Sequence, residues 1–157
     1  MTQAQQWMQT LSEVRQELLS FLQSLTPEQW QTQIFSEGST WTVSTAVSHI
    51  LDAERGMSIQ VHKARKGEPT IPEGFDIERW NAKVEERIGE RTPAELLSLL
   101  DTTRTKTLEV LNSLSEEDWS KTGRHPSRGV ITIEQYYETI AAHDRMHLAD
   151  IKTGLHN

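Results

Sequence analysis

Three histidines have the spacing that could hold a metal ion. His143 and His147 stand four residues apart, so they share one face of any helix. His49 lies in a separate stretch, residues 44–65, that also has a helical pattern. A histidine pair joined by a distant third histidine is typical of sites whose metal keeps one position open for water or substrate. The sequence therefore predicts a three-histidine divalent metal site, with zinc, nickel or iron(II) as candidate ions.

The depth of each histidine along its helix restricts the geometry of such a site. His49 lies about seven residues after the start of its helix, and His147 lies about seven residues before the end of the last one. At roughly 1.5 Å per residue, both rings lie about 10 Å from the same bundle end if the two helices are antiparallel. Parallel helices would separate the rings by about 10 Å, and the histidines would then be core or surface residues with local hydrogen bonds.

Several carboxylates lie within about one turn of these histidines and could accept the second N–H of a metal-bound imidazole. Asp52 and Glu54 follow His49 in the sequence, and Asp144 follows His143. Asp144 occupies the position of the general-base glutamate in His-Glu-x-x-His metalloproteases, so it is a candidate catalytic base or hydrogen-bond partner of a ligand. Because aspartate is shorter and the third histidine comes from elsewhere, we do not expect a protease. A solvated helix surface is the alternative for each acid.

Two tryptophans could wall the pocket of this site. Trp41 precedes the helix that carries His49, and Trp80 lies in the connection that follows that helix. Core packing is the more common role of tryptophan, so both interpretations stay open.

Four long segments repeat apolar residues at three- and four-residue steps, which is the period of an amphipathic helix. They cover roughly residues 7–25, 44–65, 92–114 and 133–151. Strand patterns are nearly absent, apart from a short alternation at Val130–Ile133. The sequence therefore predicts an all-α four-helix bundle that forms a single domain over residues 1–157.

Antiparallel second and fourth helices impose a long crossover on this bundle. The third helix pairs antiparallel with the fourth and must begin at the metal end, so residues 66–92 must cross the length of the bundle. Prolines 69 and 72 interrupt the helical pattern, and Phe75–Ile88 then reads as one short amphipathic helix. The basic loop 121–129 is expected at the end away from the metal, and Gly154 is expected to end the last helix.

A short internal repeat divides the chain into halves. The segment Ser24–Trp30 recurs in outline as Ser113–Trp119, and each copy ends one long helix and precedes another. This pattern predicts two related helical hairpins, in which the second and fourth helices are equivalent.

Composition excludes several classes of protein. The formal net charge of −7 at pH 7 argues against a nucleic-acid groove, because phosphates need a basic surface. The chain has no cysteine, so disulfides are excluded and any reacting thiol must come from another molecule. Charges interrupt the helical segments and the first residues lack a signal-peptide pattern, so we expect no membrane span and a cytoplasmic location. The expected partner is a small-molecule substrate.

The same segments resemble a known family, the DinB-like superfamily. The resemblance covers roughly residues 7–153 and rests on Trp41-Thr42-Val43 with His49-Ile50-Leu51-Asp52-Ala53-Glu54, on the closing segment His143–Ile151, and on Phe75-Asp76 and Trp80-Asn81. The last two pairs are similar to the crossover of proteins close to the N-terminal domain of mycothiol-dependent maleylpyruvate isomerase.

The resemblance implies a four-helix bundle with a divalent metal on the three histidines, often as a homodimer. It implies a metal-dependent enzyme that transfers a low-molecular-weight thiol of the bacillithiol or mycothiol type, which would be a cosubstrate. One alternative is a hydrolase that uses metal-bound hydroxide, because the same three ligands would serve it. Another is a non-catalytic, stress-related binding module whose metal is structural or absent.

Overall fold

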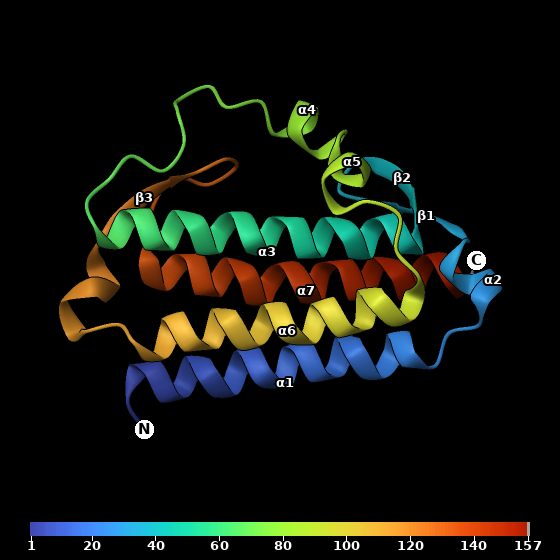
Figure 1. The fold of residues 1–157 in the computed structure, drawn as a ribbon, viewed down its shortest axis with the longest axis horizontal. Coiled ribbons are helices and arrows are strands. Elements are labelled where there is room, and N and C mark those ends of the chain that lie inside the picture. Colours follow the sequence, from blue (N-terminus) through green and yellow to red (C-terminus); the bar gives the residue numbers. More distant parts are fainter. Residues whose placement is uncertain (157) are drawn as a thin grey trace.

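The computed structural model describes residues 1–156, and four long helices lie side by side in it (Figure 1). They are α1 (Gln3–Gln23), α3 (Val43–Arg65), α6 (Pro93–Asn112) and α7 (Ile133–His156). The predicted all-α four-helix bundle is confirmed. Helices α1 and α7 run in one direction, and α3 and α6 run in the other (Figure 1). The antiparallel pairing of α3 with α7 is the arrangement that a shared metal requires.

Threonine N-caps determine where all four long helices begin, and Thr2 caps α1 by accepting from the Gln5 amide at 3.1 Å. The hydroxyl of Thr42 accepts a hydrogen bond from the Thr45 amide at 3.1 Å, which opens α3. Thr92 does the same for the Glu95 amide at the start of α6. Thr132 accepts from the amide three residues later, at the start of α7. Each cap satisfies one amide that would otherwise lack a helical partner, so the polar loops end at defined residues.

Two β-hairpins precede α3 and α7. The first pairs β1 (Gln33–Ser36) with β2 (Ser39–Thr42), and the second pairs β3 (Thr122–His125) with β4 (Gly129–Thr132). Only the region of β4 was identified from the sequence. The other strands were missed because four residues are too few to show a distinct alternation.

Each half of the chain has the same order of elements. The first half is α1, α2 (Pro27–Trp30), β1, β2 and α3, and the second is α6, a 3₁₀ turn (Glu116–Ser120), β3, β4 and α7. The hairpins are closed in the same way: the Val43 amide donates to the Thr32 carbonyl, and the Ile133 amide donates to the Lys121 carbonyl. The element order therefore follows the repeat that the sequence predicted.

The crossover between α3 and α6 is as long as predicted, but it holds two short helices instead of one. They are α4 (Ile77–Asn81) and α5 (Val84–Ile88), and they lie over one face of α3 (Figure 1). The prediction that Gly154 ends the last helix is wrong. Helix α7 continues to His156, and Gly154 instead leaves room for the side chain of Ile34.

The core consists of two apolar clusters that follow each other along the bundle. One cluster surrounds the start of α3 and contains Val47 of α3 and Leu18 of α1. The other lies farther along α3 and contains Met57 of α3 and Leu11 of α1. Charged side chains lie between the two clusters and are described below. None of the helices in residues 1–156 is long and apolar enough to cross a membrane.

Candidate metal centre

The structure brings the three predicted histidines together. His49 reaches the centre from α3, while His143 and His147 reach it from successive turns of α7. The Nε2 atom of His143 lies 3.2 Å from Nε2 of His49 and 3.1 Å from Nε2 of His147. Because all three Nε2 atoms point to one place, the rings form a single cluster of donors.

Glu37 completes this cluster and was not identified from the sequence. Its Oε2 lies 2.7 Å from His49 Nε2, and its Oε1 lies 3.2 Å from His143 Nε2. Each of the four residues offers a donor atom, and these atoms all lie within 4.8 Å of one another. Glu37 sits in the two-residue turn between β1 and β2, so its place in the cluster can be predicted only after that hairpin has been predicted.

The backbone of Glu37 is in a left-handed conformation, with a φ of 48°. Gly38 follows with a φ of 75°, as expected for a tight hairpin turn. A residue with a side chain loses roughly 1–2 kcal/mol in this region. The turn therefore holds the Glu37 carboxylate over the histidines at a cost in backbone energy, which is a common feature of functional sites.

The donor set fits a divalent cation. With bonds of about 2.0–2.1 Å, two neighbouring ligand atoms on one ion lie roughly 2.8–3.4 Å apart, from octahedral to tetrahedral geometry. The two separations from His143 Nε2, 3.1 Å to His147 Nε2 and 3.2 Å to His49 Nε2, fall inside that interval. Three imidazoles with one carboxylate suit zinc, nickel or iron(II). The assignment of a metal to these residues stays a prediction that the geometry supports.

The far side of the His147 ring is held by hydrogen bonds. Ser36 Oγ donates to Asp150 Oδ2 at 2.6 Å and lies 2.8 Å from His147 Nδ1. Because the single hydroxyl proton of Ser36 goes to Asp150, the serine oxygen accepts the proton of Nδ1. This arrangement leaves the lone pair on Nε2, which is the tautomer that a metal ligand needs.

The His49 ring is oriented by packing. The Trp41 ring lies 4.8 Å from the His49 ring and 6.4 Å from the His147 ring, so Trp41 does line the site. Nδ1 of His49 is buried and has no hydrogen-bond partner among residues 1–156.

Burial and neighbouring charges set the protonation of the cluster. Burial lowers the pKa of His143 below its ordinary value, and the nearby His147 and His49 rings add to this effect. Burial by itself would raise the pKa of Glu37, but hydrogen bonds from the three histidines outweigh it and hold that pKa far below its usual range. Neutral His143 beside ionised Glu37 is the state that can bind a cation.

The predicted roles of Asp144 and Glu54 need correction. The Asp144 carboxylate accepts hydrogen bonds from Arg15 Nε at 2.8 Å and from Arg104 Nη2 at 3.1 Å. The Glu54 carboxylate accepts from Arg104 Nε at 3.0 Å and from Thr107 Oγ1 at 2.6 Å. Both carboxylates point into the buried layer between the apolar clusters, and neither has a hydrogen bond to a histidine within residues 1–156. A carboxylate shared by two guanidinium groups is a poor proton acceptor, so neither acid is suited to act as the base.

Asp52 shares a face of α3 with His49, but the crossover holds its carboxylate. It accepts hydrogen bonds from the Trp80 indole at 3.0 Å and from Arg87 Nη2 at 2.7 Å. Asp52 therefore fixes the crossover onto α3. Trp80 belongs to the crossover, and its indole meets α3 at Asp52, about one helical turn from His49. Within residues 1–156, the Trp80 ring makes no contact with the histidine rings.

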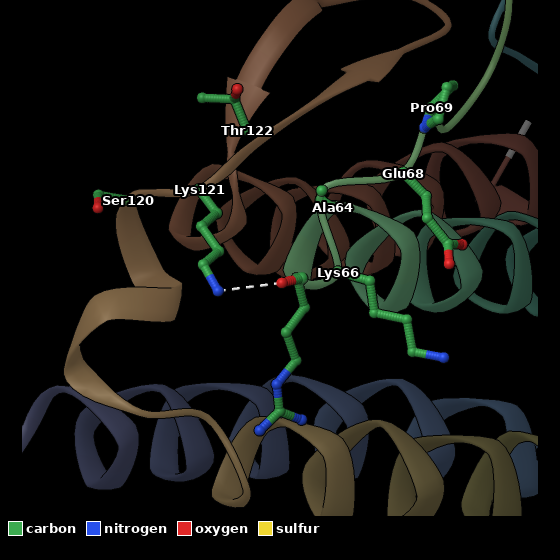
Figure 2. A pocket seen from close by; sticks show the side chains of 9 residues that line it. Ala64, Lys66, Glu68, Pro69, Ser120, Lys121 and Thr122 are labelled. Atoms are coloured by element: carbon green, nitrogen blue, oxygen red, sulfur yellow. Dashed lines mark hydrogen bonds between the residues drawn. The ribbon is translucent and has the colours of Figure 1, made fainter.

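Another hollow lies at the opposite end of α3 (Figure 2). It has a volume of about 710 Å³ and lies between the end of α3 and the start of β3, where Lys121 Nζ donates to the Arg65 carbonyl at 3.0 Å. Residue 65 is roughly 24 Å from residue 49 along the helix axis, at 1.5 Å per residue. The start of the basic loop 121–129 is thus at the end away from the candidate metal, as predicted, but its tip returns along α7, where Arg128 Nη1 donates to Thr139 Oγ1 at 2.6 Å, one turn before His143.

The chain belongs to the DinB superfamily, whose sequence profile matches residues 10–151. Among curated relatives, the protein of Oceanobacillus iheyensis named "Putative metal-dependent hydrolase OB0782" is 27% identical over 147 residues, which are 93% of this chain and 82% of that protein.

Solved structures show the same fold. YfiT from Bacillus subtilis, described as a probable metal-dependent hydrolase with an unusual four-helix bundle topology, superposes with a TM-score of 0.78 at 23% identity over 98% of this chain and 87% of that one. The mycothiol-dependent maleylpyruvate isomerase superposes with a TM-score of 0.76 at 17% identity, and the match covers 96% of this chain and 61% of that one.

Proposed function

We propose that the protein is a metal-dependent hydrolase whose centre is formed by His49, His143 and His147, with Glu37 as the adjacent proton acceptor. The convergence of three imidazole Nε2 atoms with one carboxylate carries this proposal. The names of the curated relatives, which describe metal-dependent hydrolases, support the same class of activity.

A divalent cation at such a centre lowers the pKa of a bound water or thiol and so supplies a nucleophile near neutral pH. The surrounding residues explain how the nucleophile could be prepared. The side chain of Glu37 is 30% exposed, whereas those of His49 and His147 are at most 4% exposed. Glu37 therefore closes the cluster on the solvent side, where an incoming water would pass. The hydrogen bonds that lower its pKa come from the same Nε2 atoms that would bind the cation, so they would be absent in the metal-loaded protein and would leave the carboxylate free to accept a proton.

Metal analysis tests the proposed centre. Purified protein incubated with zinc and desalted should retain about one ion per chain, and the His147→Ala variant should lose most of it, because two imidazoles bind zinc more weakly than three. The exposed His62 on α3 provides the control, since His62→Ala should retain the metal of the unmodified protein. Equal metal in the His147→Ala variant and the unmodified protein would overturn the proposal.

Thiol transfer is the second candidate, and one observation favours it. The chain has no cysteine, so the reacting thiol would be a cosubstrate of the bacillithiol or mycothiol type, and the structurally similar isomerase is described as mycothiol-dependent. Two assays of the zinc-loaded protein separate the candidates. Hydrolysis of 4-nitrophenyl acetate without thiol supports the hydrolase. Consumption of a cysteine-based thiol with monobromobimane, dependent on His147, supports the transferase.

If the protein shows neither activity, and bound zinc raises its melting temperature, these results would support a non-catalytic module with a structural metal.

We also propose a small-molecule substrate, a homodimer and a cytoplasmic location, as expected from the sequence and the family. Sedimentation of the zinc-loaded protein tests the homodimer, because a single species of about twice the 18.0 kDa chain mass is expected.

A further inference from the structure

The crossover forms a cavity that the metal centre does not use. Its volume is about 340 Å³, which is in the range of small-molecule sites. Six residues line it: Phe75, Asp76, Arg79, Trp80, Lys83 and Arg87. All of them belong to α4, α5 or the residues next to these helices.

Two residues of α3 fix the crossover beside the candidate metal ligand His49. Asp52 holds Trp80 and Arg87, as described above, and Thr45 Oγ1 donates to Glu85 Oε1 at 2.7 Å. Thr45 precedes His49 by four residues and Asp52 follows it by three, so the three side chains share one face of α3. The crossover is therefore attached to α3 on both sides of His49, and two residues that line the cavity, Trp80 and Arg87, contact α3 at Asp52, about one helical turn from His49.

Aromatic rings form the floor of this cavity. The Phe75 and Trp80 rings lie 5.7 Å apart, and the Arg87 guanidinium stacks 3.9 Å from the centre of the Trp80 ring. Trp80 is 42% exposed, although its indole N–H is held by Asp52. A large aromatic surface that is rigid and open to solvent is suited to bind a flat or apolar group.

Three of the six residues that line the cavity are cations, and one, Asp76, is an acid. Arg87 is paired with Asp52 at 2.7 Å, and the Asp76 carboxylate caps α4 by accepting from the Arg79 amide at 3.0 Å. The side chains of Arg79 and Lys83 make no ion pair within residues 1–156. Two free cations beside an aromatic floor stand out on a chain whose net charge is −7.

We propose that this cavity binds the anionic end of the substrate, which would be a small organic acid with a flat unsaturated body. Arg79 and Lys83 would hold the acid group, and Trp80 and Phe75 would hold the body. This inference rests on the proposed function, since it assigns the reacting part of the molecule to the nearby metal centre. The cavity is thus a subsite for substrate recognition and adds no residue to the chemistry.

Binding of 1-naphthoate to the full-length protein tests the subsite. We expect calorimetry to detect binding and the Trp80 indole N–H resonance to shift during the titration. Lys83→Ala and Arg79→Ala should each weaken binding about tenfold, because a charge-assisted hydrogen bond is lost. Lys106→Ala, which removes an exposed cation from α6, is the matched control and should leave the affinity unchanged. All three positions are exposed, so the variants should fold.

Two further titrations test whether the charge and the flat body of the ligand both contribute to binding. The cation 1-naphthylmethylamine should bind much more weakly than 1-naphthoate, and inorganic phosphate should compete only weakly because it lacks the flat body. Equal binding of the cation, or an affinity that Lys83→Ala and Arg79→Ala leave unchanged, would overturn the inference. The His147→Ala variant separates this result from the proposed function. It should lose zinc and still bind 1-naphthoate, whereas loss of naphthoate binding in that variant alone would place the acid on the metal and overturn the subsite.

Discussion

Ser36 connects the first hairpin to the metal centre through one hydroxyl group. It donates to Asp150 and accepts from His147 Nδ1, so it fixes both the tautomer and the orientation of that ring. Its position in β1 also places it directly before Glu37, so one short turn supplies two of the contacts that shape the site.

Replacing Ser36 should therefore weaken metal binding without removing a ligand. We expect Ser36→Ala to lower zinc affinity about 10–100-fold, which is the usual effect of losing such a partner. Competition with a chromophoric chelator measures the affinity directly. Ser39→Ala, in the paired strand, is the control and should bind zinc as tightly as the unmodified protein. Unchanged affinity in Ser36→Ala would show that the hydroxyl does not set the tautomer.

Glu37 can be tested separately from the histidines. Glu37→Gln keeps the size of the side chain and removes its charge, so hydrolysis of 4-nitrophenyl acetate should fall about 10²–10⁴-fold if the carboxylate accepts a proton. Zinc content should stay near one ion per chain, and Glu109→Gln on the exposed face of α6 should change neither quantity. A loss of zinc as large as in His147→Ala would instead make Glu37 a ligand of the ion.

Single residues of the site differed in how well the sequence could predict them. The three histidines were predictable because a helix brings residues four apart onto one face, and because their depths matched in two antiparallel helices. Glu37 and Ser36 were not, since their contact with the histidines depends on a hairpin of two four-residue strands. Asp144 was misassigned because proximity along a helix does not say which way a side chain points, and Asp144 points toward Arg15 and Arg104.

At the scale of elements, the first hairpin packs closely against α7 where Ile34 meets Gly154. A Cβ atom added to Gly154 would lie 2.7 Å from Cβ of Ile34 and still closer to its Cγ2 atom. Gly154 lies within α7, where glycine is otherwise less favourable than alanine. Close packing of the hairpin against the helix is a sufficient reason for glycine at this position.

The space around Gly154 and Gly56 predicts opposite effects on stability when each is replaced by alanine. Gly154→Ala should reduce the free energy of unfolding by about 1–3 kcal/mol, because the core around Ile34 would be overpacked. Gly56→Ala in α3 should raise it by about 0.5–1 kcal/mol, since nothing lies within 4 Å of the added atom. Urea unfolding measures both changes. In the double variant with Ile34→Ala, Gly154→Ala should cost less than it does alone, and simple additivity would contradict the contact.

The long helices were predicted well and the short elements poorly, because only a long helix repeats its apolar pattern many times. The four long helices each show many apolar repeats, and their stripes pack against one another. The crossover was predicted from chain direction, but its division into α4 and α5 was not. Lys83 departs from helical geometry with a ψ of 14°, and no pattern of apolar residues marks that break.

At the scale of the whole molecule, four buried charges join the two halves. Arg15 donates to the Leu100 carbonyl at 2.7 Å, and Arg104 donates to the Leu11 carbonyl at 2.6 Å. Leu11 and Arg15 are four residues apart, as are Leu100 and Arg104. Their partners Glu54 and Asp144 each lie twelve residues after the threonine that caps their helix. The layer is therefore nearly two-fold symmetric, like the order of the elements.

This layer predicts how stability depends on pH. Burial by itself would raise the pKa of Glu54, but Arg15 and Arg104 outweigh it and lower that pKa to about 2. Because the pKa is lower in the folded state, the carboxylate stabilises the fold above its ordinary pKa of 4.5, and this contribution is lost as the pH falls toward 2. The loss amounts to about 3 kcal/mol, at 1.36 kcal/mol per pKa unit.

Urea unfolding of metal-free protein between pH 7 and pH 2.5 measures this dependence. The Glu54→Gln variant should be less stable at pH 7, because two guanidinium groups lose a charged partner. Its stability should also fall less steeply below pH 5 than that of the unmodified protein, since one titrating group is absent. Glu109→Gln should follow the unmodified protein. Parallel pH curves for Glu54→Gln and the unmodified protein would show that Glu54 titrates alike in the folded and unfolded states.

The exchange of arginine hydrogen bonds between the halves also bears on how the chain folds. Neither helical hairpin can satisfy its own guanidinium group, because each arginine needs a carbonyl oxygen from the other hairpin. An intermediate in which only one half had collapsed would keep its own ion pair, Arg15–Glu54 or Arg104–Asp144, but would bury guanidinium N–H groups without their carbonyl acceptors, which is costly. Folding should therefore be cooperative between the first helix and the last, despite the apparent modularity of the repeat.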